Sequence, residues 1–387
     1  MIAPGERLAR AALAGVVEPG DERLGRLIAA WGPEPVWVAL RKGAPPPEGV
    51  SARHWSGLCL RAEKADPERD LERIGALGGR FLCPGDREWP GQLADLGAAA
   101  PIGLWVRGPC SLRFVGLRAV ALVGARACTD YGAHVAAELA TGLAERGWTV
   151  VSGAAFGIDG AAHRGALAVS GVTVAVLACG VDVSYPLAHR ELLDRIAGSG
   201  LVVAELAPGD HPTRGRFIQR NRVIAALSRG TVVVEAARRS GALATARHTT
   251  GLGRHLMAVP GPVTSGLSAG AHRLIRSEAT LVSSAAEIIE LVGEIGELAD
   301  PGPEPLVPRD LLAPRAARVL EALPAEGSLG LTEIARGACA GEEEARARLV
   351  ELCALGFVER VGEHWRLPPG STRHARVVLA GKAHGGT

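Results

Sequence analysis

The chain has 387 residues, and its 47% hydrophobic content excludes disorder as the overall state because so many apolar residues can bury a sizeable core. The 43 basic and 41 acidic residues give a formal net charge of +2, which excludes a chain that is basic throughout. No apolar run reaches the roughly 18 residues that a membrane span needs, and the N-terminus has no apolar signal core. We therefore expect a cytoplasmic protein without membrane contact, built from about two or three domains.

The seven cysteines form no C-x-x-C pair, so the sequence predicts neither a metal site nor a disulfide framework. We expect them to be small buried residues in a reduced compartment. The 51 glycines and 25 prolines are too many for an all-helical protein and are typical of a chain with many strand-to-helix turns.

Residues 1–75 predict a small helical domain. Apolar residues such as Leu8, Ala11 and Ala12, and then Leu24 and Leu27, recur at helical spacing. A proline-rich stretch at residues 43–47 interrupts this pattern.

Residues 76–298 predict a doubly wound, Rossmann-like α/β domain. Short runs that are apolar on both faces alternate with helical patterns, as in a parallel sheet covered on both sides. The predicted strands are Ala119–Val123, Thr149–Ser152, Val172–Ala178, Leu201–Leu206, Thr231–Glu235, Leu256–Val259 and Ala279–Val282, and a helix over Ala285–Val292 closes the domain.

Residues 299–314 predict a stiff linker, and residues 369–387 a frayed tail. The linker contains five prolines: Pro301, Pro303, Pro305, Pro308 and Pro314. Between them, residues 315–368 predict a winged-helix domain, with helices over Ala316–Leu323, Leu331–Ala338 and Glu342–Leu355 and a hairpin that turns at Gly362-Glu363.

The charge of the predicted winged helix favours a protein contact. Its residues 315–367 hold seven arginines and nine glutamates, and Glu342, Glu343 and Glu344 begin the third helix. Repulsion between like charges disfavours the reading of duplex DNA by that helix.

The first candidate site is the run Val123-Gly124-Ala125-Arg126, where a strand ends before a helix that starts near Asp130. Backbone N–H groups at such a helix start, beside a guanidinium, suit an anion. The GxGxxG pattern of dinucleotide-binding enzymes is absent from this run, and the chain has no GxxxxGK[ST] loop. The sequence therefore disfavours a nicotinamide or flavin oxidoreductase and an ATPase.

The second candidate site is the loop from Ser152 to Asp159. Ser152 and Gly153 would let the backbone approach a phosphate after the second parallel strand. Asp159 and His163 are four residues apart and could form an acid–base or metal pair on one helix face. A capping role for Asp159 and a packing role for His163 are favoured over that pair.

Arginine is concentrated between His211 and Arg276, where Glu235 is the one acid. We expect Arg220-Asn221-Arg222 and Arg238-Arg239-Ser240-Gly241 to lie in strand-to-helix turns that line the crevice of the sheet. A nucleic-acid backbone fits this many cations better than a mononucleotide does. Phe156 and Phe217 are candidates for stacking on single-stranded bases, although a core position is the commoner role for such a residue. The eleven arginines are Arg214, Arg216, Arg220, Arg222, Arg229, Arg238, Arg239, Arg247, Arg254, Arg273 and Arg276.

Taken in order, these loops resemble the DNA-processing protein A family, also called DprA or Smf. The resemblance covers about residues 80–290. The matching stretches are Val123–Arg126 with Tyr131-Gly132; Val151–Gly153 with Gly157–Asp159 and Ala162-His163; Ala175–Leu177 with Gly180–Asp182 and Tyr185-Pro186; Arg220–Arg222; Ser240–Leu243 with Thr245-Ala246; and Ala258–Gly261.

The resemblance implies a non-enzymatic protein, with no cofactor, that binds single-stranded DNA without sequence preference. It also implies a homodimer formed through the Rossmann domain, which loads RecA recombinase onto strands coated by single-strand-binding protein during natural transformation and recombination. The N-terminal helices would correspond to the family's SAM-like domain. The residues expected to bind DNA are Gly124, Arg126, Ser152, Gly153, Phe156, Arg220, Asn221, Arg222, Arg239, Ser240 and Gly241.

The chain also departs from the family pattern. Phe156 stands where lysine or arginine is usual, so one phosphate contact would be lost and replaced by stacking or by another arginine, such as Arg164, Arg214 or Arg216. Ala125, His189 and Ile218 stand where serine, asparagine and proline are common. The alternative is a nucleotide-binding Rossmann enzyme resembling phosphoribohydrolases, but the run from Arg239 to Thr245 lacks the glutamate that follows the corresponding loop there.

Overall fold

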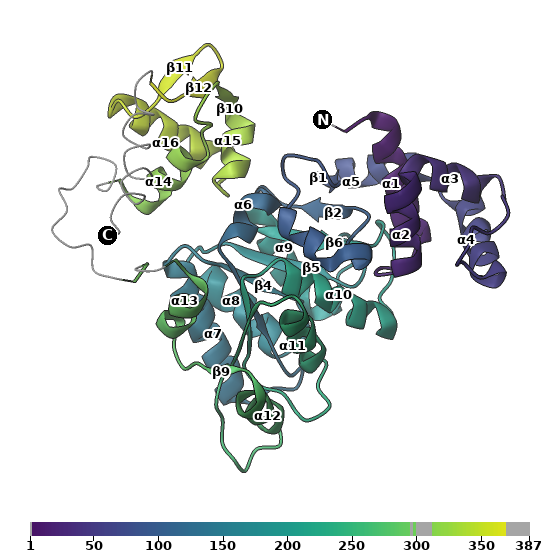
Figure 1. Ribbon diagram of the computed structural model, residues 1–387. Helices are drawn as coiled ribbons and strands as arrows, with labels where there is room; N and C mark the ends of the chain where they lie inside the picture. The colour runs from purple at the N-terminus through teal and green to yellow at the C-terminus, as the bar shows by residue number, and fades with distance from the viewer. Residues whose placement is uncertain (1, 295–296, 299–311, 369–387) are drawn as a thin grey trace, which may run out of the picture. The chain divides into compact units, whose positions relative to one another are not determined.

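The computed structural model describes residues 2–294, 297–298 and 312–368 (Figure 1). The chain divides into two compact units, one of residues 1–108 and 112–298 and one of residues 109–111 and 299–387. Most of the predicted linker and the whole predicted tail lie outside the described residues, and Pro314 is the first residue of a helix.

The N-terminal part of the first unit is helical, as the sequence predicts, and it contains five helices. Asp21 and Asp66 cap the second and fifth of them by accepting hydrogen bonds from backbone N–H groups. The first four surround a core that includes Leu13, Leu24 and Leu58, yet they belong to the same compact unit as the sheet. The helices are α1 (Pro4–Val16), α2 (Glu22–Trp31), α3 (Pro33–Arg41), α4 (Ala52–Lys64) and α5 (Pro67–Ala76).

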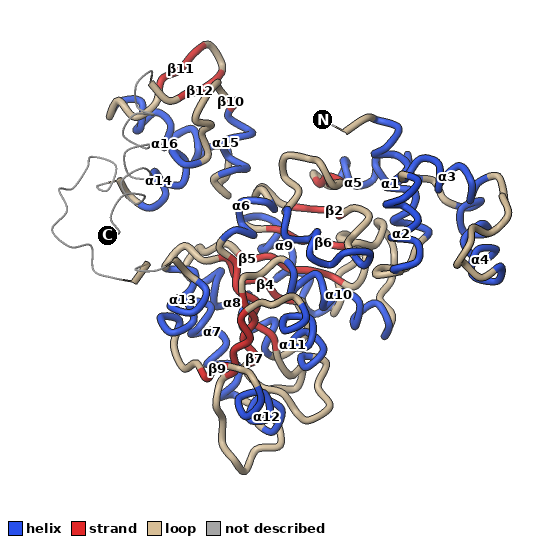
Figure 2. Tube along the Cα trace, in the orientation of Figure 1, coloured by secondary structure: helices blue, strands red, loops and turns tan. Residues whose placement is uncertain are grey.

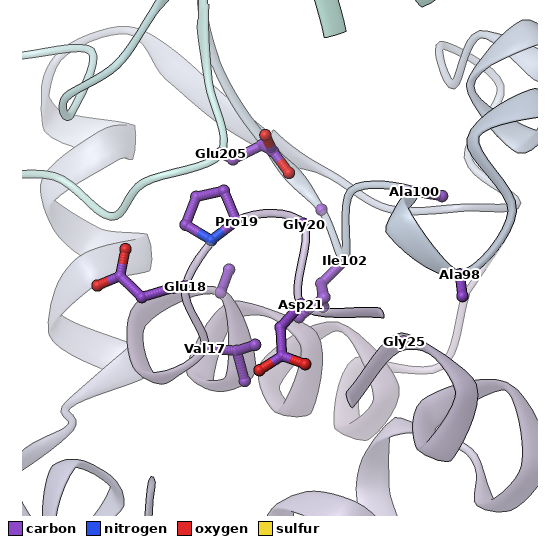
Figure 3. Close-up of a pocket in the computed structure, with 12 residues that line it drawn as sticks. Val17, Glu18, Pro19, Gly20, Asp21, Gly25, Ala98, Ala100, Ile102 and Glu205 are labelled. Atoms are coloured by element: carbon purple, nitrogen blue, oxygen red, sulfur yellow. The ribbon is translucent and has the colours of Figure 1, made fainter. Parts of the chain in front are cut away.

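The loop between α1 and α2 packs against the rest of the unit. Figure 3 shows this loop, residues 17–21, beside Glu205 and close to Ala98 and Ala100. Gly25 of α2 lies so near the carbonyl of Ala98 that a Cβ there would overlap the oxygen.

A nine-stranded sheet forms the centre of the first unit, with strand order β1-β2-β6-β5-β4-β3-β7-β8-β9. Figure 2 shows its strands in red, with helices around them in blue. All neighbours from β6 to β9 are parallel, which confirms the predicted Rossmann-like sheet, and the predicted strand ends shift by at most two residues. The antiparallel strands β1, at the edge, and β2, next to it, were not predicted. The strands are β1 (Gly79–Leu82), β2 (Leu104–Arg107), β3 (Ala119–Val123), β4 (Thr149–Ser152), β5 (Thr173–Leu177), β6 (Leu201–Ala204), β7 (Gly230–Val233), β8 (His255–Ala258) and β9 (Thr280–Leu281).

Helices connect and cover these strands. Residues of α7, α8 and α13 pack with residues of β3, β4, β7 and β8 into one buried core, in which Trp148 is 1% exposed. The elements are η1 (Gly91–Ala99), α6 (Leu112–Leu117), α7 (Asp130–Glu145), α8 (Ile158–Ala168), η2 (Leu187–His189), α9 (Arg190–Ser199), α10 (Arg214–Ala226), α11 (Ala242–Gly251), α12 (Ala269–Ser277) and α13 (Ala285–Val292).

The strand order reverses next to β3. From β3 the chain adds β4, β5 and β6 on one side and then returns to place β7 on the other side. In open parallel sheets, ligands bind at such a switch point, in the crevice outside the carboxyl ends of the strands. The fold therefore places a ligand crevice at the ends of β3 and β7.

In its described residues, 109–111 and 312–368, the second unit contains three helices and a three-stranded antiparallel sheet. The helices and the hairpin were predicted, and β10 adds a third strand to give the order β10-β12-β11. Val319, Leu349 and Trp365 are buried in its core. The elements are α14 (Pro314–Glu321), β10 (Leu329–Gly330), α15 (Leu331–Gly337), α16 (Glu342–Ala354), β11 (Glu359–Val361) and β12 (His364–Arg366).

Two expectations about the whole chain can be compared with the structure. Among the described helices, none has the length and apolar character needed to cross a membrane. The seven cysteines, all within the described ranges, form no disulfide; Cys83, Cys110 and Cys179 are buried, but Cys353 is exposed, so the expectation of burial holds for only part of the set.

Candidate nucleic-acid interface

A cleft of about 880 Å³ lies at the switch point of the sheet. The loop that follows β3, the N-terminal part of α10 and the start of α11 form its walls. We call this the switch-point cleft; its lining includes Gly124, Arg126, Asp159, Tyr185, Arg214, Phe217, Arg220, Asn221, Arg239, Ser240, Gly241 and Arg247.

The loop after β3 carries Arg126 into the switch-point cleft. Arg126 is exposed, and its Cζ lies 4.5 Å from the centroid of the Phe217 ring, within the range of a cation–π contact. The Phe217 ring also lies 5.5 Å from the ring of Tyr185. A cation and two aromatic rings therefore meet on one side of the cleft.

A buried acid fixes the same loop. Glu235 is 2% exposed and accepts hydrogen bonds from the backbone N–H and the hydroxyl of Thr129, at 2.9 and 2.6 Å. Thr129 in turn caps α7, which begins at Asp130 as predicted. Gly124 is required by packing, because a Cβ there would lie 2.5 Å from the Cγ1 of Ile158.

Hydrogen bonds to side chains hold the loop after β4, and some of its residues are therefore closed to a ligand. The Ser152 hydroxyl is buried and donates to the Leu122 carbonyl at 2.6 Å. Asp159 accepts hydrogen bonds from the N–H groups of Gly153 and Ala155. The predicted helix-capping role of Asp159 is wrong, because Gly157 is the N-cap residue and no side chain caps α8.

The predicted packing role of His163 is confirmed. Its Nδ1 lies 2.7 Å from the hydroxyl of Thr173, which itself donates to the carbonyl of Val150. Burial, together with the nearby His189 and arginines, lowers the pKa of His163 to about 3. Within the described ranges, no group of three or more His, Cys, Asp or Glu side chains is placed to hold a metal ion.

Phe156 lies at the exposed end of the loop after β4. Its side chain is 49% exposed, and its ring packs edge-on against His189 with 5.0 Å between centroids. His189 also anchors the loop, since its Nδ1 lies 3.0 Å from the carbonyl oxygen of Ala154. The aromatic ring is therefore displayed to solvent on a fixed support.

The eleven arginines of residues 211–276 do not share one surface. Arg214, Arg239 and Arg247 are exposed and line the switch-point cleft. Others pair with acids elsewhere: Arg216 with Glu18, Arg222 with Glu205 and Arg254 with Asp95.

The predicted placement of Arg220-Asn221-Arg222 in a turn is wrong, because these residues lie inside α10. Arg222 is 2% exposed and donates two hydrogen bonds to Glu205, so its guanidinium has no free face for a phosphate. Arg220 is 6% exposed and donates to the carbonyl of Gly153. Burial lowers the pKa of Arg220 to about 10, and the carboxylate of Asp159 opposes this shift.

The turn before α11 contributes the last predicted residues. Arg239 and Gly241 are exposed, and the Ser240 hydroxyl accepts a hydrogen bond from the N–H of Ala242 at 3.3 Å. Asn221 bridges this turn to α10 by donating to the Gly241 carbonyl at 3.4 Å. The Arg239 guanidinium and the start of α11 together suit an anion.

Sequence reasoning did not single out Arg247, Tyr185 or Glu235 as parts of the site. Arg247 follows Ala244 by three residues on α11, a spacing that places both on the cleft-facing side of the helix. No such periodicity marks Tyr185 or Glu235, because they reach the site from loops.

Comparisons with known proteins show the family to which the chain belongs. The model of the DNA recombination-mediator protein A family matches residues 80–293. The putative DNA processing protein DprA of Mycobacterium tuberculosis (strain CDC 1551 / Oshkosh) is 45% identical over 377 residues, which cover 95% of each chain.

The X-ray structure of DprA from Streptococcus pneumoniae aligns with a TM-score of 0.63 and 31% identity, over 76% of this chain and 100% of that one. A structure of DprA from Helicobacter pylori, reported for its unique single-stranded DNA binding mode, aligns with a TM-score of 0.49 and 27% identity, over 54% of this chain and 94% of that one. The chain belongs to the DNA recombination-mediator protein A family.

Proposed function

We propose that this protein binds single-stranded DNA without sequence preference in the switch-point cleft. The observation that carries the proposal is that four exposed arginines, Arg126, Arg214, Arg239 and Arg247, line the same cleft as the ring of Phe217, over which Arg126 lies. Repeated cations suit successive phosphates, and an aromatic face suits an unpaired base of any sequence.

The acids near the cleft do not cancel this positive charge. Glu235 is buried and satisfied by Thr129, and Asp159 faces Arg220. The four exposed arginines therefore remain available for phosphate.

We further propose that the protein loads the RecA recombinase onto single-stranded DNA coated by single-strand-binding protein, in natural transformation and recombination. In this role it acts as a homodimer and catalyses no reaction. Membership of the recombination-mediator family supports this role. Assembly of RecA filaments on protein-coated single strands, with and without this chain, tests it; equal assembly rates would rule out loading.

The DNA site itself is tested by binding measured over a range of salt concentrations. Arg126→Ala should weaken binding and reduce the slope of log K against log salt by about 0.7, which corresponds to one lost phosphate contact on a single strand. Arg146→Ala is the matched control, because Arg146 is exposed at the C-terminal end of α7. This end of the helix lies at the amino ends of the parallel strands, whereas the cleft lies at their carboxyl ends. Equal slopes in both variants would show that the site is wrongly placed.

The enzymatic alternative has its own test. A phosphoribohydrolase would release free base from nucleoside monophosphates, and detection of that base would replace the proposal of a purely binding protein.

A further inference from the structure

The loop after β4, residues 153–157, is held by hydrogen bonds to two buried charged side chains, those of Asp159 and Arg220. We call this loop the glycine loop. Asp159 Oδ2 accepts the N–H of Gly153 at 3.1 Å and the N–H of Ala155 at 3.4 Å. Arg220 Nη1 donates to the carbonyl oxygen of Gly153 at 2.7 Å and also to the carbonyl of Val176 at the end of β5. The residue Gly153 is thus tied through both its N–H and its carbonyl.

Arg220 lines the cleft, but its side chain is far less accessible to a ligand than that of Arg126. It is 6% exposed, and its Nε lies 3.3 Å from the Oδ1 of Asn221 while Nη1 donates to the two carbonyls. Asp159 is 7% exposed, and its carboxylate interacts electrostatically with the Arg220 guanidinium, so both charges are withdrawn from the solvent. This differs from Arg126, whose guanidinium is exposed in the cleft.

The glycine at position 153 fits the same interpretation. A Cβ there would lie within 2.5 Å of Cζ and Nη1 of Arg220. The missing side chain therefore leaves room for the guanidinium, and not only for an approaching phosphate.

The fixed loop leaves its outer N–H groups free. In the part of the chain that the structure describes, the N–H groups of Phe156 and Gly157 donate to no protein acceptor. Gly157 has a φ of 74°, which turns the chain sharply into α8. Successive free N–H groups in such a turn form a concave site for an anion.

We propose that Arg220 is a positioning residue for single-stranded DNA: through its bond to Gly153 it fixes the glycine loop in the shape that receives a phosphate, and it does not touch the DNA. The inference rests on the proposed function of the switch-point cleft. It assigns Arg220 a different role from Arg126, although both are arginines beside the same cleft.

Two variants test the role, and neither removes a charge. Arg220→Lys keeps the cation but cannot reach both carbonyls with the same geometry. Gly153→Ala inserts a methyl group against the guanidinium. Each variant should weaken single-stranded DNA binding about tenfold, because binding would then have to order a loop residue that the wild type already holds fixed. The salt slope should equal that of the wild type, because no phosphate contact is lost, whereas Arg126→Ala lowers it.

The double variant, Arg220→Lys with Gly153→Ala, tests whether both changes break the same contact. Its loss of affinity should be clearly smaller than the product of the two single losses. A full product would mean that Gly153 and Arg220 act independently, and the proposal would fail.

Amide hydrogen exchange on the protein without DNA gives a readout that does not depend on binding. Exchange at Gly153 and Ala155 should be about tenfold faster or more in both single variants and unchanged in Arg126→Ala. Unchanged exchange, or a salt slope that falls in Arg220→Lys as it does in Arg126→Ala, would overturn the positioning role. A wild-type protein that binds no single-stranded DNA would instead overturn the proposed function, while exchange in the variants would still show whether Arg220 fixes the loop.

Discussion

Replacement of Arg222 by alanine should destabilise the first unit without removing a DNA contact. The Arg222 side chain is 2% exposed and donates two hydrogen bonds to Glu205, at 2.5 and 2.6 Å, and one to the Ala99 carbonyl at 2.9 Å. Alanine would leave the Glu205 side chain, which is 11% exposed, without its cation. Removing one partner of a buried ion pair costs about 3–5 kcal/mol, so we expect the free energy of unfolding to fall by that amount.

Urea denaturation followed by tryptophan fluorescence measures this loss, because Trp105 and Trp148 are buried in the first unit. The double variant Arg222→Met with Glu205→Leu removes both charges and should regain most of the lost stability. Arg146→Ala, at an exposed position, should stay within about 0.5 kcal/mol of the wild type. The reasoning is refuted if Arg222→Ala unfolds like the wild type while its salt slope for single-stranded DNA decreases.

Two further predictions concern stacking and pH. Phe156→Ala should weaken single-stranded DNA binding by about 1–3 kcal/mol per base stacked on the ring and leave the salt slope unchanged, as measured by fluorescence anisotropy with a thymidine oligomer; an unchanged affinity would mean that no base stacks there. Between pH 7 and pH 5 the free energy of unfolding should fall by about 2 kcal/mol on account of His163, because the unfolded chain binds a proton below its pKa of about 6.5 while burial lowers the folded pKa to about 3. Urea titrations of His163→Gln at several pH values should show a flatter dependence, and an identical dependence would assign the effect to another group.

The parallel strands could be predicted because their side chains are buried on both faces of the sheet. The five residues of β3 are all apolar, and the same holds for the buried middle of β5 and β6. The edge strand β1 contains Gly79 and Arg80, so its four residues show neither a continuous apolar run nor a clear alternation. Such short edge strands become visible only when a neighbour is present to pair with them.

The arginine count predicted a cationic crevice but not which arginines line it. Arg220 and Arg222 are two residues apart, which on an α-helix turns the second side chain by about 200° relative to the first. Arg220 therefore reaches the glycine loop from α10, while Arg222 reaches Glu205 on the other side of the helix. A count along the sequence cannot separate such neighbours, because the separation depends on what packs against each face of the helix.

The contacts between α10 and the N-terminal helices bear on how the protein can be shortened for study. On one side α10 presents Phe217 to the cleft, and on the other Arg216 pairs with Glu18 of the loop between α1 and α2 at 3.0 Å. A fragment that begins at residue 76 would lose Glu18 and the close packing of Gly25 on Ala98. In that fragment α10, which forms one wall of the cleft, would lack its contacts with the N-terminal helices. A weak affinity of the fragment for single-stranded DNA would therefore result from the truncation and would not measure the affinity of the intact site.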